Sequence, residues 1–448
     1  MMAIRLARRN FNVDVYERRP SVSQAHAAQR SFTVTLSKRG LMALNEIGLM
    51  EAALKISSPI SGRMVHNPDG TTTYVPYSKD NREQLHAIRR NDINALLYAA
   101  AQQFPNIRFF FNQSLTRMDK ATNTLWFQDQ SQPQHAATEV QAPLIVGCDG
   151  VFSAVRQQMQ RGERADFHQD FLDWGYKDVF IPAQPNGQHA LQAGALHLWP
   201  RGNCTFFAFP NIDGTFSGNF IAPFEFAEQL TTPEAHAELL QREFSDLLAV
   251  APALPQTLAA LPMSHFITMH TTQWHYKDRI VLLGDAAHAV TPFWGEGMNS
   301  AFEDTAVLDN CLADAPDDRL AAFARFQTLR KPNTDLLAQL AKQNFVELRD
   351  TTASLRVVAR KTIERKLYQL FPDKWLPLNI MISHRAMSYT EAVARYQKQQ
   401  RLARRFGMNV LAFLFAIGPA AHRSLQKLTR ATRRERRTQQ MPMDKVMQ

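Results

Sequence analysis

Residues 279–288 read RIVLLGDAAH, and this stretch decides the fold. A short apolar run ends in Gly284 and Asp285, which is typical of a buried parallel strand that delivers polar groups at its carboxyl end. Residues 143–150, PLIVGCDG, repeat this pattern. Because both strands are apolar throughout and end in an acid, the sequence predicts an α/β fold with a parallel sheet.

The first residues predict a helix followed by a strand. Apolar residues recur at helical spacing in 2–10, and residues 12–17, NVDVYE, alternate up to Glu17. In a dinucleotide-binding βαβ unit such an acid bonds a ribose and lies about 20 residues beyond a Gly-x-Gly-x-x-Gly loop. Only 16 residues precede Glu17, and the first glycine is Gly40. We therefore expect an in-frame upstream extension that encodes the first strand and the Gly-rich loop.

Composition excludes several classes of protein. Of the 448 residues, 45% are apolar, 21% charged and 10% aromatic, unlike disordered, collagen-like or multi-span membrane proteins. The three cysteines, Cys148, Cys204 and Cys311, are far apart and encode neither a disulfide framework nor a structural zinc site. The sequence offers no convincing metal-ligand cluster and no Ser-His-Asp arrangement. We expect no metal, a reducing compartment and a cytoplasmic location, since no secretory leader pattern is present.

The net charge of +10 is concentrated in one segment. Residues 401–440 hold ten Lys and Arg against one acid, Glu435, and they flank the apolar run 408–421. That run has 14 residues, whereas a membrane-spanning helix needs about 20. A helix lying at the inner face of an anionic membrane and a helix packed on the body are equally favoured. Nucleic-acid binding is the least favoured alternative, because aromatic residues do not interleave the charges.

Three segments together resemble the FAD-dependent aromatic hydroxylases, the para-hydroxybenzoate hydroxylase-like family. They are ERRP at 17–20, GCDGVFSAVR at 147–156, and GDAAH at 284–288 with the loop PFWGEGMN at 292–299. The resemblance implies FAD as cofactor, NADPH as co-substrate and O₂ as oxidant. The cofactor-binding residues that it implies are Glu17, Arg18, Arg90, Asp149, Asp285, Pro292, Gly295, Gly297, Met298 and Asn299. His288 is expected to be structural rather than a catalytic base, and a helix beginning near Met298 would direct its positive end at the flavin.

The resemblance implies a domain organisation. An α/β, Rossmann-like FAD-binding domain is expected over 1–170 and 275–340, with its first strand absent and with 60–88 contributing to the substrate site. An inserted antiparallel β-sheet domain for the substrate is expected over 171–274, because 175–225 is rich in Phe, Trp and Thr with intervening turn signals. A helical capping region over 341–400, interrupted near 371–372 and 377, and an apolar and basic tail over 401–448 complete the prediction.

Within the family, the resemblance narrows to the hydroxylases of L-kynurenine. Short local matches carry it: YERRP at 16–20, GRMVH at 62–66, GYK at 175–177, LHLWP at 196–200, NFVE at 344–347 and Tyr389. The resemblance implies that Arg63, Tyr77, Asn344 and Tyr389 hold the amino-acid end of the substrate. A guanidinium binds a carboxylate through two parallel hydrogen bonds, and phenol and amide groups complete such a polar site.

The aromatic end departs from the family pattern. Phe207 and Phe209 point to one face of a predicted strand, and Ile221 replaces a Phe. Trp294 stands where a His is expected, and Glu296 where a Gln is expected. The substrate-binding residues predicted here are Phe207, Phe209, Ile221, Pro292, Phe293 and Trp294.

The expected activity is hydroxylation of L-kynurenine beside its ring amino group in tryptophan catabolism, with the chemistry carried by the flavin. No side chain is predicted to be catalytic. Two alternatives stay open: hydroxylation of another aromatic amino-acid derivative, and a non-catalytic homologue that lacks the cofactor.

Overall fold

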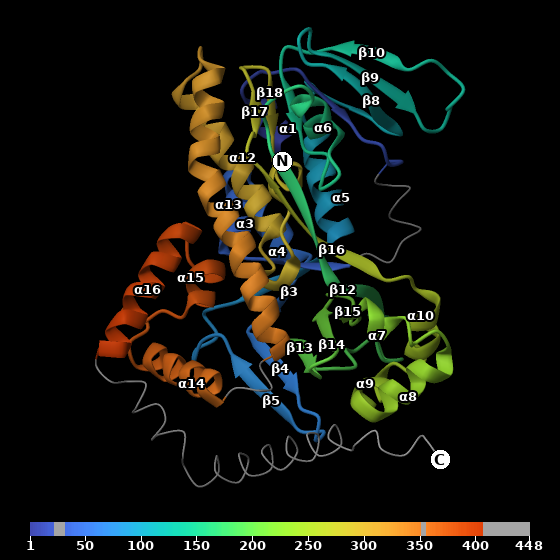
Figure 1. The fold of residues 1–448 in the computed structure, drawn as a ribbon, viewed down its shortest axis with the longest axis vertical. Coiled ribbons are helices and arrows are strands. Elements are labelled where there is room, and N and C mark those ends of the chain that lie inside the picture. The colour runs from blue at the N-terminus through green and yellow to red at the C-terminus, as the bar shows by residue number, and fades with distance from the viewer. Residues whose placement is uncertain (22–31, 351–354, 406–448) are drawn as a thin grey trace, which may run out of the picture. The chain divides into compact units, whose positions relative to one another are not determined.

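The computed structural model describes residues 1–21, 32–350 and 355–405 (Figure 1). Met1–Thr352 and Asn379–Ala392 form one compact unit, and the described residues outside these ranges belong to a second, smaller unit. The predicted apolar and basic tail, including 408–421, lies almost entirely outside the described residues.

The N-terminal prediction of a helix and a strand is confirmed. Helix α1 (Met2–Arg8) buries Ile4 and Leu6, and strand β1 (Val13–Tyr16) ends directly before Glu17. Strand β1 pairs in parallel with β7 (Ile107–Phe110), which follows helix α5 (Arg90–Ala101). Glu17 therefore sits at the carboxyl end of a parallel strand.

The two strands that decide the fold are parallel neighbours. Strand β11 (Ile145–Gly147) pairs with β18 (Ile280–Leu282), and β17 (His275–Tyr276) pairs with the other edge of β18. All three residues of β18 are buried, which explains the uninterrupted apolar run. Four helical elements surround these strands: α6 (Ala154–Gln160), α11 (Asp285–His288), α12 (Gly297–Asp314) and α13 (Arg319–Asp350).

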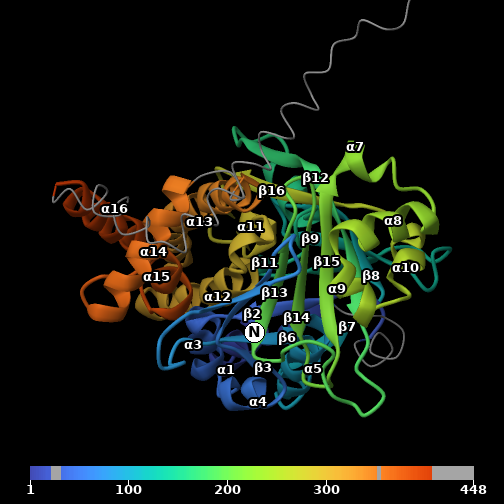
Figure 2. The ribbon, with the colours of Figure 1, turned by 90° about the horizontal axis from the view of Figure 1, so that it is seen from below.

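A seven-stranded sheet forms the second layer, in the order β16-β12-β15-β14-β13-β4-β5 (Figures 1 and 2). Its strands are β4 (Gly62–His66), β5 (Thr72–Pro76), β12 (Phe167–Ile181), β13 (Ala195–Pro200), β14 (Thr205–Pro210), β15 (Phe216–Pro223) and β16 (Ser264–Thr271). The prediction of an antiparallel sheet is correct for 175–225, but β4 joins β13 in parallel, so the whole sheet is mixed. The chain enters this sheet before residue 171, because β12 begins at Phe167.

One face of this sheet is covered by helices. Trp199, Phe206 and Phe220 pack in a buried cluster with Leu240 and Phe244 from the helical segment. That segment comprises α7 (Phe224–Ala227), α8 (Pro233–Glu243), α9 (Ser245–Val250) and α10 (Leu254–Ala260). The opposite face stays available for the functional site.

Two further three-stranded sheets complete the description of the strands. A three-stranded sheet joins β2 (Thr33–Leu36), β6 (Leu85–Arg89) and β3 (Ser58–Ile60), with helices α3 (Lys38–Glu46) and α4 (Met50–Lys55) beside it. Another sheet joins β10 (Thr138–Gln141), β9 (Thr124–Asp129) and β8 (Gln113–Asp119).

The C-terminal region is helical, as predicted. It comprises α14 (Leu355–Leu370), α15 (Leu378–His384) and α16 (Tyr389–Arg405), and the breaks fall near the predicted positions. Among the residues that the structure describes, no helix has the length and apolar character needed to cross a bilayer.

Candidate functional site

Asp285 lies at the turn that follows β18. Gly284 makes this turn with φ +58, and its N–H donates to Asp304 Oδ2 at 3.0 Å. The Asp285 carboxylate makes no hydrogen bond with any described residue. Although solvent reaches it, desolvation by the surrounding protein raises the pKa of Asp285, while His288 and Arg90 oppose this rise. The carboxylate is therefore free to accept hydrogen bonds from a ligand.

Arg90 lies near the acids that follow two parallel strands, Glu17 after β1 and Asp285 after β18. It begins α5, and burial and Arg19 lower the pKa of Arg90, whereas Asp285 and Glu17 raise it. The guanidinium thus lies within electrostatic reach of both acids, as expected of a group near a dinucleotide. Arg18 is exposed beside Glu17.

Asp149 has a local structural role. Its carboxylate accepts hydrogen bonds from the Ser153 hydroxyl and, at 3.0 Å, from the N–H of Val155, while the Ser153 hydroxyl caps α6 by accepting from the N–H of Arg156 at 2.9 Å. These bonds satisfy N–H groups at the start of the helix. A contact between Asp149 and a cofactor stays a prediction.

The loop before α12 is fixed by Asn299. Its side chain donates to the carbonyls of Thr35 at 2.8 Å and Gly295 at 2.9 Å, and it accepts from the N–H of Ser37 at 3.0 Å. Gly295 has φ +67, and a Cβ there would lie 2.7 Å from the Thr35 hydroxyl. The loop therefore requires glycine at position 295. Asn299 is buried and holds the loop through its hydrogen bonds.

The first turn of α12 follows this loop directly. Gly297 begins the helix, and Met298 packs half-buried against the apolar cluster around Leu36 and Ile93. The helix is 18 residues long, so its N-terminus places partial positive charge at the loop. This is the position that the sequence predicted for the helix beside the flavin.

Glu296 in the same loop is almost fully buried. Its carboxylate accepts hydrogen bonds from the hydroxyls of Ser37 at 3.2 Å and Tyr389 at 3.1 Å, and it lies 3.9 Å from Arg39 Nε. Burial raises the pKa of Glu296 to about 7, although Arg39 and the hydroxyl groups oppose the rise. The sequence identified Glu296 only as a departure from the family pattern, and no local signal connects it with Ser37 and Arg39.

A buried group of charges continues from this loop into α12 and α13. Arg39 and Arg330 both bond Glu303, and Arg330 also bonds Asp304 at 2.7 Å. Asp304 in turn contacts His288, whose ring stacks on Trp274 with centroids 5.0 Å apart. Burial raises the pKa of Asp304, but His288 and Arg330 outweigh that effect and hold it below its usual range. These contacts hold the His288 ring between Asp304 and Trp274, as expected of a structural residue.

The predicted binding residues for an amino-acid group come from three elements, β4, α13 and α16, and from the bend that follows β5. Arg63 lies on β4, and its buried Nε has no hydrogen-bond partner among the described residues. Tyr77 is buried beside His384, with ring centroids 5.2 Å apart, and Arg63 helps to lower the pKa of His384 to about 4, after burial as the main cause. Asn344 on α13 donates to the Phe293 carbonyl at 2.6 Å. Tyr389 is fully buried and donates its hydroxyl hydrogen to Glu296.

Several of the predicted aromatic residues are brought together. Phe207, Ile221 and Phe293 belong to one apolar cluster, which also contains Trp174, Tyr176, Phe266 and Phe345. Phe209 is half-buried on the same strand as Phe207, and Pro292 is exposed. Trp294 has a buried Nε1–H that bonds none of the residues described by the structure. This N–H and Arg63 Nε are two polar groups that a ligand could satisfy.

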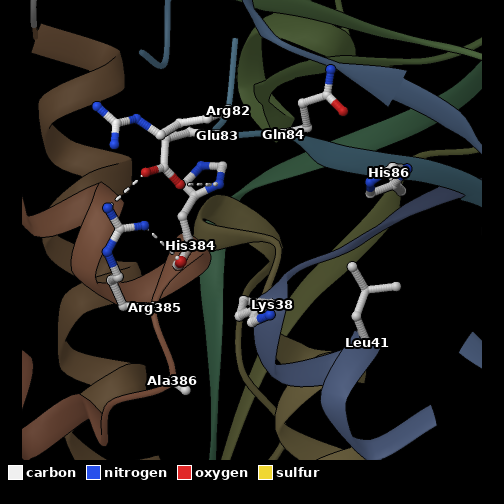
Figure 3. A pocket seen from close by; sticks show the side chains of 9 residues that line it. All are labelled: Lys38, Leu41, Arg82, Glu83, Gln84, His86, His384, Arg385 and Ala386. Atoms are coloured by element: carbon white, nitrogen blue, oxygen red, sulfur yellow. Dashed lines mark hydrogen bonds and ion pairs between the residues drawn. The ribbon is translucent and has the colours of Figure 1, made fainter. Parts of the chain in front are cut away.

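A cavity of about 450 Å³ lies beside His384 (Figure 3). Glu83 pairs there with Arg385 at 2.7 Å and lies 3.8 Å from His384. The lining residues are Lys38, Leu41, Arg82, Glu83, Gln84, His86, His384, Arg385 and Ala386. Because the His384 ring also lies beside the Tyr77 ring, the cavity adjoins the predicted amino-acid site.

Comparisons with known proteins agree with this geometry. Residues 1–320 match the family model described as FAD binding domain. A kynurenine 3-monooxygenase of Salinispora arenicola is 42% identical, over 98% of this chain and 96% of its own. The chain belongs to the kynurenine 3-monooxygenase family. The kynurenine 3-monooxygenase of Sus scrofa is 33% identical, over 92% of this chain and 86% of its own.

Solved structures share the fold of this kynurenine 3-monooxygenase family member. The tetrameric form of 2-methyl-3-hydroxypyridine-5-carboxylic acid oxygenase matches with a TM-score of 0.65 and 18% identity, over 79% of this chain and 90% of the other. This likeness confirms the predicted fold, and the family model together with the curated relatives confirms the predicted enzyme class. The protein is an FAD-dependent monooxygenase with NADPH as co-substrate.

The residues of the site fit FAD. The carboxylate of Asp285 suits a ligand hydroxyl, and Gly297, which has no side chain at the start of α12, leaves space for a ring beside the helix N-terminus. The N–H of Gly295 is bonded to the Pro292 carbonyl at 2.8 Å. Arg90, near Glu17 and Asp285, suits a diphosphate. Individual contacts of these residues with the cofactor stay predictions.

Proposed function

We propose that the protein hydroxylates L-kynurenine at ring position 3, using NADPH and O₂, in tryptophan catabolism. The observation that carries the proposal is the buried Nε of Arg63, which has no hydrogen-bond partner in the part of the chain that the structure describes and lies near Tyr77 and His384. A substrate carboxylate would satisfy this guanidinium, and the names of the relatives supply the substrate class.

FAD supplies the redox chemistry when it is bound, taking electrons from NADPH and activating O₂. The chain's own residues bind and orient the substrate. Arg63 neutralises the carboxylate, and Tyr77 closes the polar end of the site. The Tyr389 hydroxyl donates its hydrogen to Glu296. The oxygen of this hydroxyl is therefore left to accept a hydrogen bond from the substrate ammonium group.

The aromatic cluster around Phe207, Ile221 and Phe293 supports the arene end of the site. Such a wall orients a planar ring and excludes water from the reacting position. Asn344 on α13 donates a hydrogen bond to the Phe293 carbonyl. This bond restrains the backbone that carries the Phe293 side chain. We infer that Asn344 acts on the substrate partly through this loop.

A second candidate substrate is another aromatic amino acid that carries an additional hydrogen-bond acceptor. The buried N–H of Trp294, which has no partner within 1–21, 32–350 and 355–405, favours this candidate, because a buried donor is stabilised only by an acceptor. Both candidates share the amino-acid group and differ only at the ring.

The test is a visible spectrum followed by product analysis. The purified chain is supplied with FAD, desalted, and titrated with L-kynurenine, and NADPH oxidation and product are then measured. A retained flavin spectrum that changes with kynurenine, with 3-hydroxykynurenine formed in proportion to NADPH consumed, supports the proposal. A flavin spectrum that does not change with kynurenine favours the second candidate substrate. A protein that retains no flavin contradicts the proposal.

We also propose a cytoplasmic enzyme whose residues 401–440 contact the inner face of a membrane. The charge of this segment and its apolar run support the proposal, since basic residues near a membrane are attracted to anionic lipids. Sedimentation of the full chain with vesicles of phosphatidylserine, but not with neutral phosphatidylcholine vesicles, is the expected result. Sedimentation unchanged by removal of residues 406–448 contradicts it.

A further inference from the structure

Two histidines face each other across the antiparallel strands β12 and β16. His168 is directly opposite His270 in the register, and their rings stack with centroids 4.9 Å apart. Asp170 lies two residues beyond His168, so it projects from the same face of the sheet. One ligand atom from each of these three side chains lies within 4.8 Å of the other two.

We propose that His168, Asp170 and His270 bind a divalent transition-metal ion, with Zn²⁺ as the best-fitting ion. Two imidazole nitrogens and a carboxylate oxygen form a ligand set that zinc accepts in four-coordinate geometry, with water in the remaining position. Ligand atoms around a tetrahedral zinc ion are about 3.4 Å apart. Small rotations of these side chains therefore suffice to close the site.

A carboxylate behind His270 supports this assignment. Asp335 on α13 has Oδ1 3.7 Å from His270 Nδ1, which leaves Nε2 of the ring for a metal. A histidine ligand is commonly oriented by a carboxylate on its second nitrogen, which fixes the tautomer and strengthens the ligand. Lys331 holds Asp335 from the other side at 2.6 Å. His270 thus has a carboxylate within ion-pair distance of its Nδ1 before any ion binds.

The ligand set also selects the class of ion. Imidazole prefers zinc, copper and nickel, whereas Mg²⁺ and Ca²⁺ prefer all-oxygen sites. The side chains of His168 and Asp170 are 63% and 55% exposed, so an ion reaches them directly from solvent. The set is separate from the predicted cofactor and substrate residues, none of which belongs to it.

An ion at this position would join the two strands and, through Asp335, helix α13. The register of β12 and β16 is regular from Phe167 to Phe171 and becomes irregular before Gly175. A metal bound to His168 and His270 would hold the regular end together. Because the unfolded chain does not preserve this site, binding would also raise the stability of the folded protein.

The experiment is a calorimetric titration of the full chain with Zn²⁺. The protein carries no polyhistidine tag and is stripped with EDTA and dialysed. We expect one ion per chain, and at least about tenfold weaker binding in each of His168→Gln and His270→Gln. His265→Gln is the matched control, because His265 is an exposed histidine of β16 outside the set, and it should bind as the unaltered protein does.

Circular dichroism of each variant establishes that it is folded before titration. The proposal is overturned if His168→Gln and His270→Gln bind Zn²⁺ as tightly as the unaltered protein, or if the unaltered protein binds none. Equal binding of Mg²⁺ and Zn²⁺ also contradicts it, because two imidazoles do not favour Mg²⁺. Asp335→Asn should weaken binding by about tenfold without abolishing it.

Discussion

The Tyr389 hydroxyl donates a hydrogen bond to Glu296 Oε2 over 3.1 Å, so that a predicted substrate-binding residue is joined to the loop before α12. The guanidinium of Arg39 lies 4.0 Å from the centre of the Tyr389 ring and 3.9 Å from the same carboxylate oxygen. Movement of this loop is therefore coupled to the position of Tyr389 by one carboxylate.

Replacing Glu296 by Gln should change how stability depends on pH. The pKa of Glu296 is about 7 in the folded protein against an ordinary value of 4.5, so the folded state holds the proton more tightly. Its contribution is fully present below pH 4.5 and is lost as the pH rises through 7, by up to about 3 kcal/mol. Glu296→Gln has no such loss.

Denaturant unfolding at pH 5 and pH 8 measures this effect. The difference in unfolding free energy between Glu296→Gln and the unaltered protein should move in favour of the variant at pH 8. A difference that is the same at both pH values would show that the Glu296 carboxyl does not titrate between them.

Replacing Asp304 by Asn should destabilise the protein strongly. Asp304 is fully buried between His288 and Arg330, and loss of one partner of a buried ionic pair costs about 3–5 kcal/mol. Because the pKa of Asp304 is lowered, its contribution is present at neutral pH and is lost as the pH falls through the folded-state value. Thermal unfolding at pH 7 tests this, with the exposed Asp317→Asn as control. Equal melting temperatures for the two variants would contradict it.

The strands of the parallel sheet could be predicted because their signal is local. An apolar run followed by Gly-Asp or Asp-Gly is complete within ten residues, and β11 and β18 lie where those runs occur. The same holds for α12, whose start follows from the glycines and Asn299 of its loop. The mixed sheet was only partly predictable, since the pairing of β4 with β13 joins distant parts of the chain.

The buried charges could not be predicted in this way. Glu296 contacts Ser37 and Arg39 from one part of the sequence and Tyr389 from another, both far from residue 296. Likewise, His168 and His270 form no pattern in the sequence and become neighbours only through strand register. This ligand set is consequently not recognisable in the sequence alone. For Asp149 the motif predicts a ligand contact, which stays a prediction, and the structure adds the hydrogen bonds of its carboxylate to the start of α6.

Replacing Arg63 by Lys should weaken substrate binding more than it affects folding. Lysine keeps the positive charge but loses the planar pair of donors that binds a carboxylate. A lost hydrogen bond to a charged group costs about 1.5–3 kcal/mol, so KM for L-kynurenine should rise at least about tenfold. Steady-state kinetics measure this, and Arg117→Lys on β8 is the control, since Arg117 is exposed and stacks on Trp126. An unchanged KM for Arg63→Lys would remove Arg63 from the substrate site.

Replacing Asp285 by Asn should weaken FAD binding while leaving the fold intact. The carboxylate makes no hydrogen bond with any described residue, and desolvation raises its pKa, so its removal costs the folded protein little. A ligand hydroxyl loses a charged acceptor, which corresponds to about a 10- to 100-fold higher Kd for FAD. Quenching of flavin fluorescence on binding measures this Kd, with the exposed Asp166→Asn as control. If Asp285→Asn binds FAD as tightly as the control does, the ligand hydroxyls lie elsewhere, and the free carboxylate at the end of β18 serves another purpose.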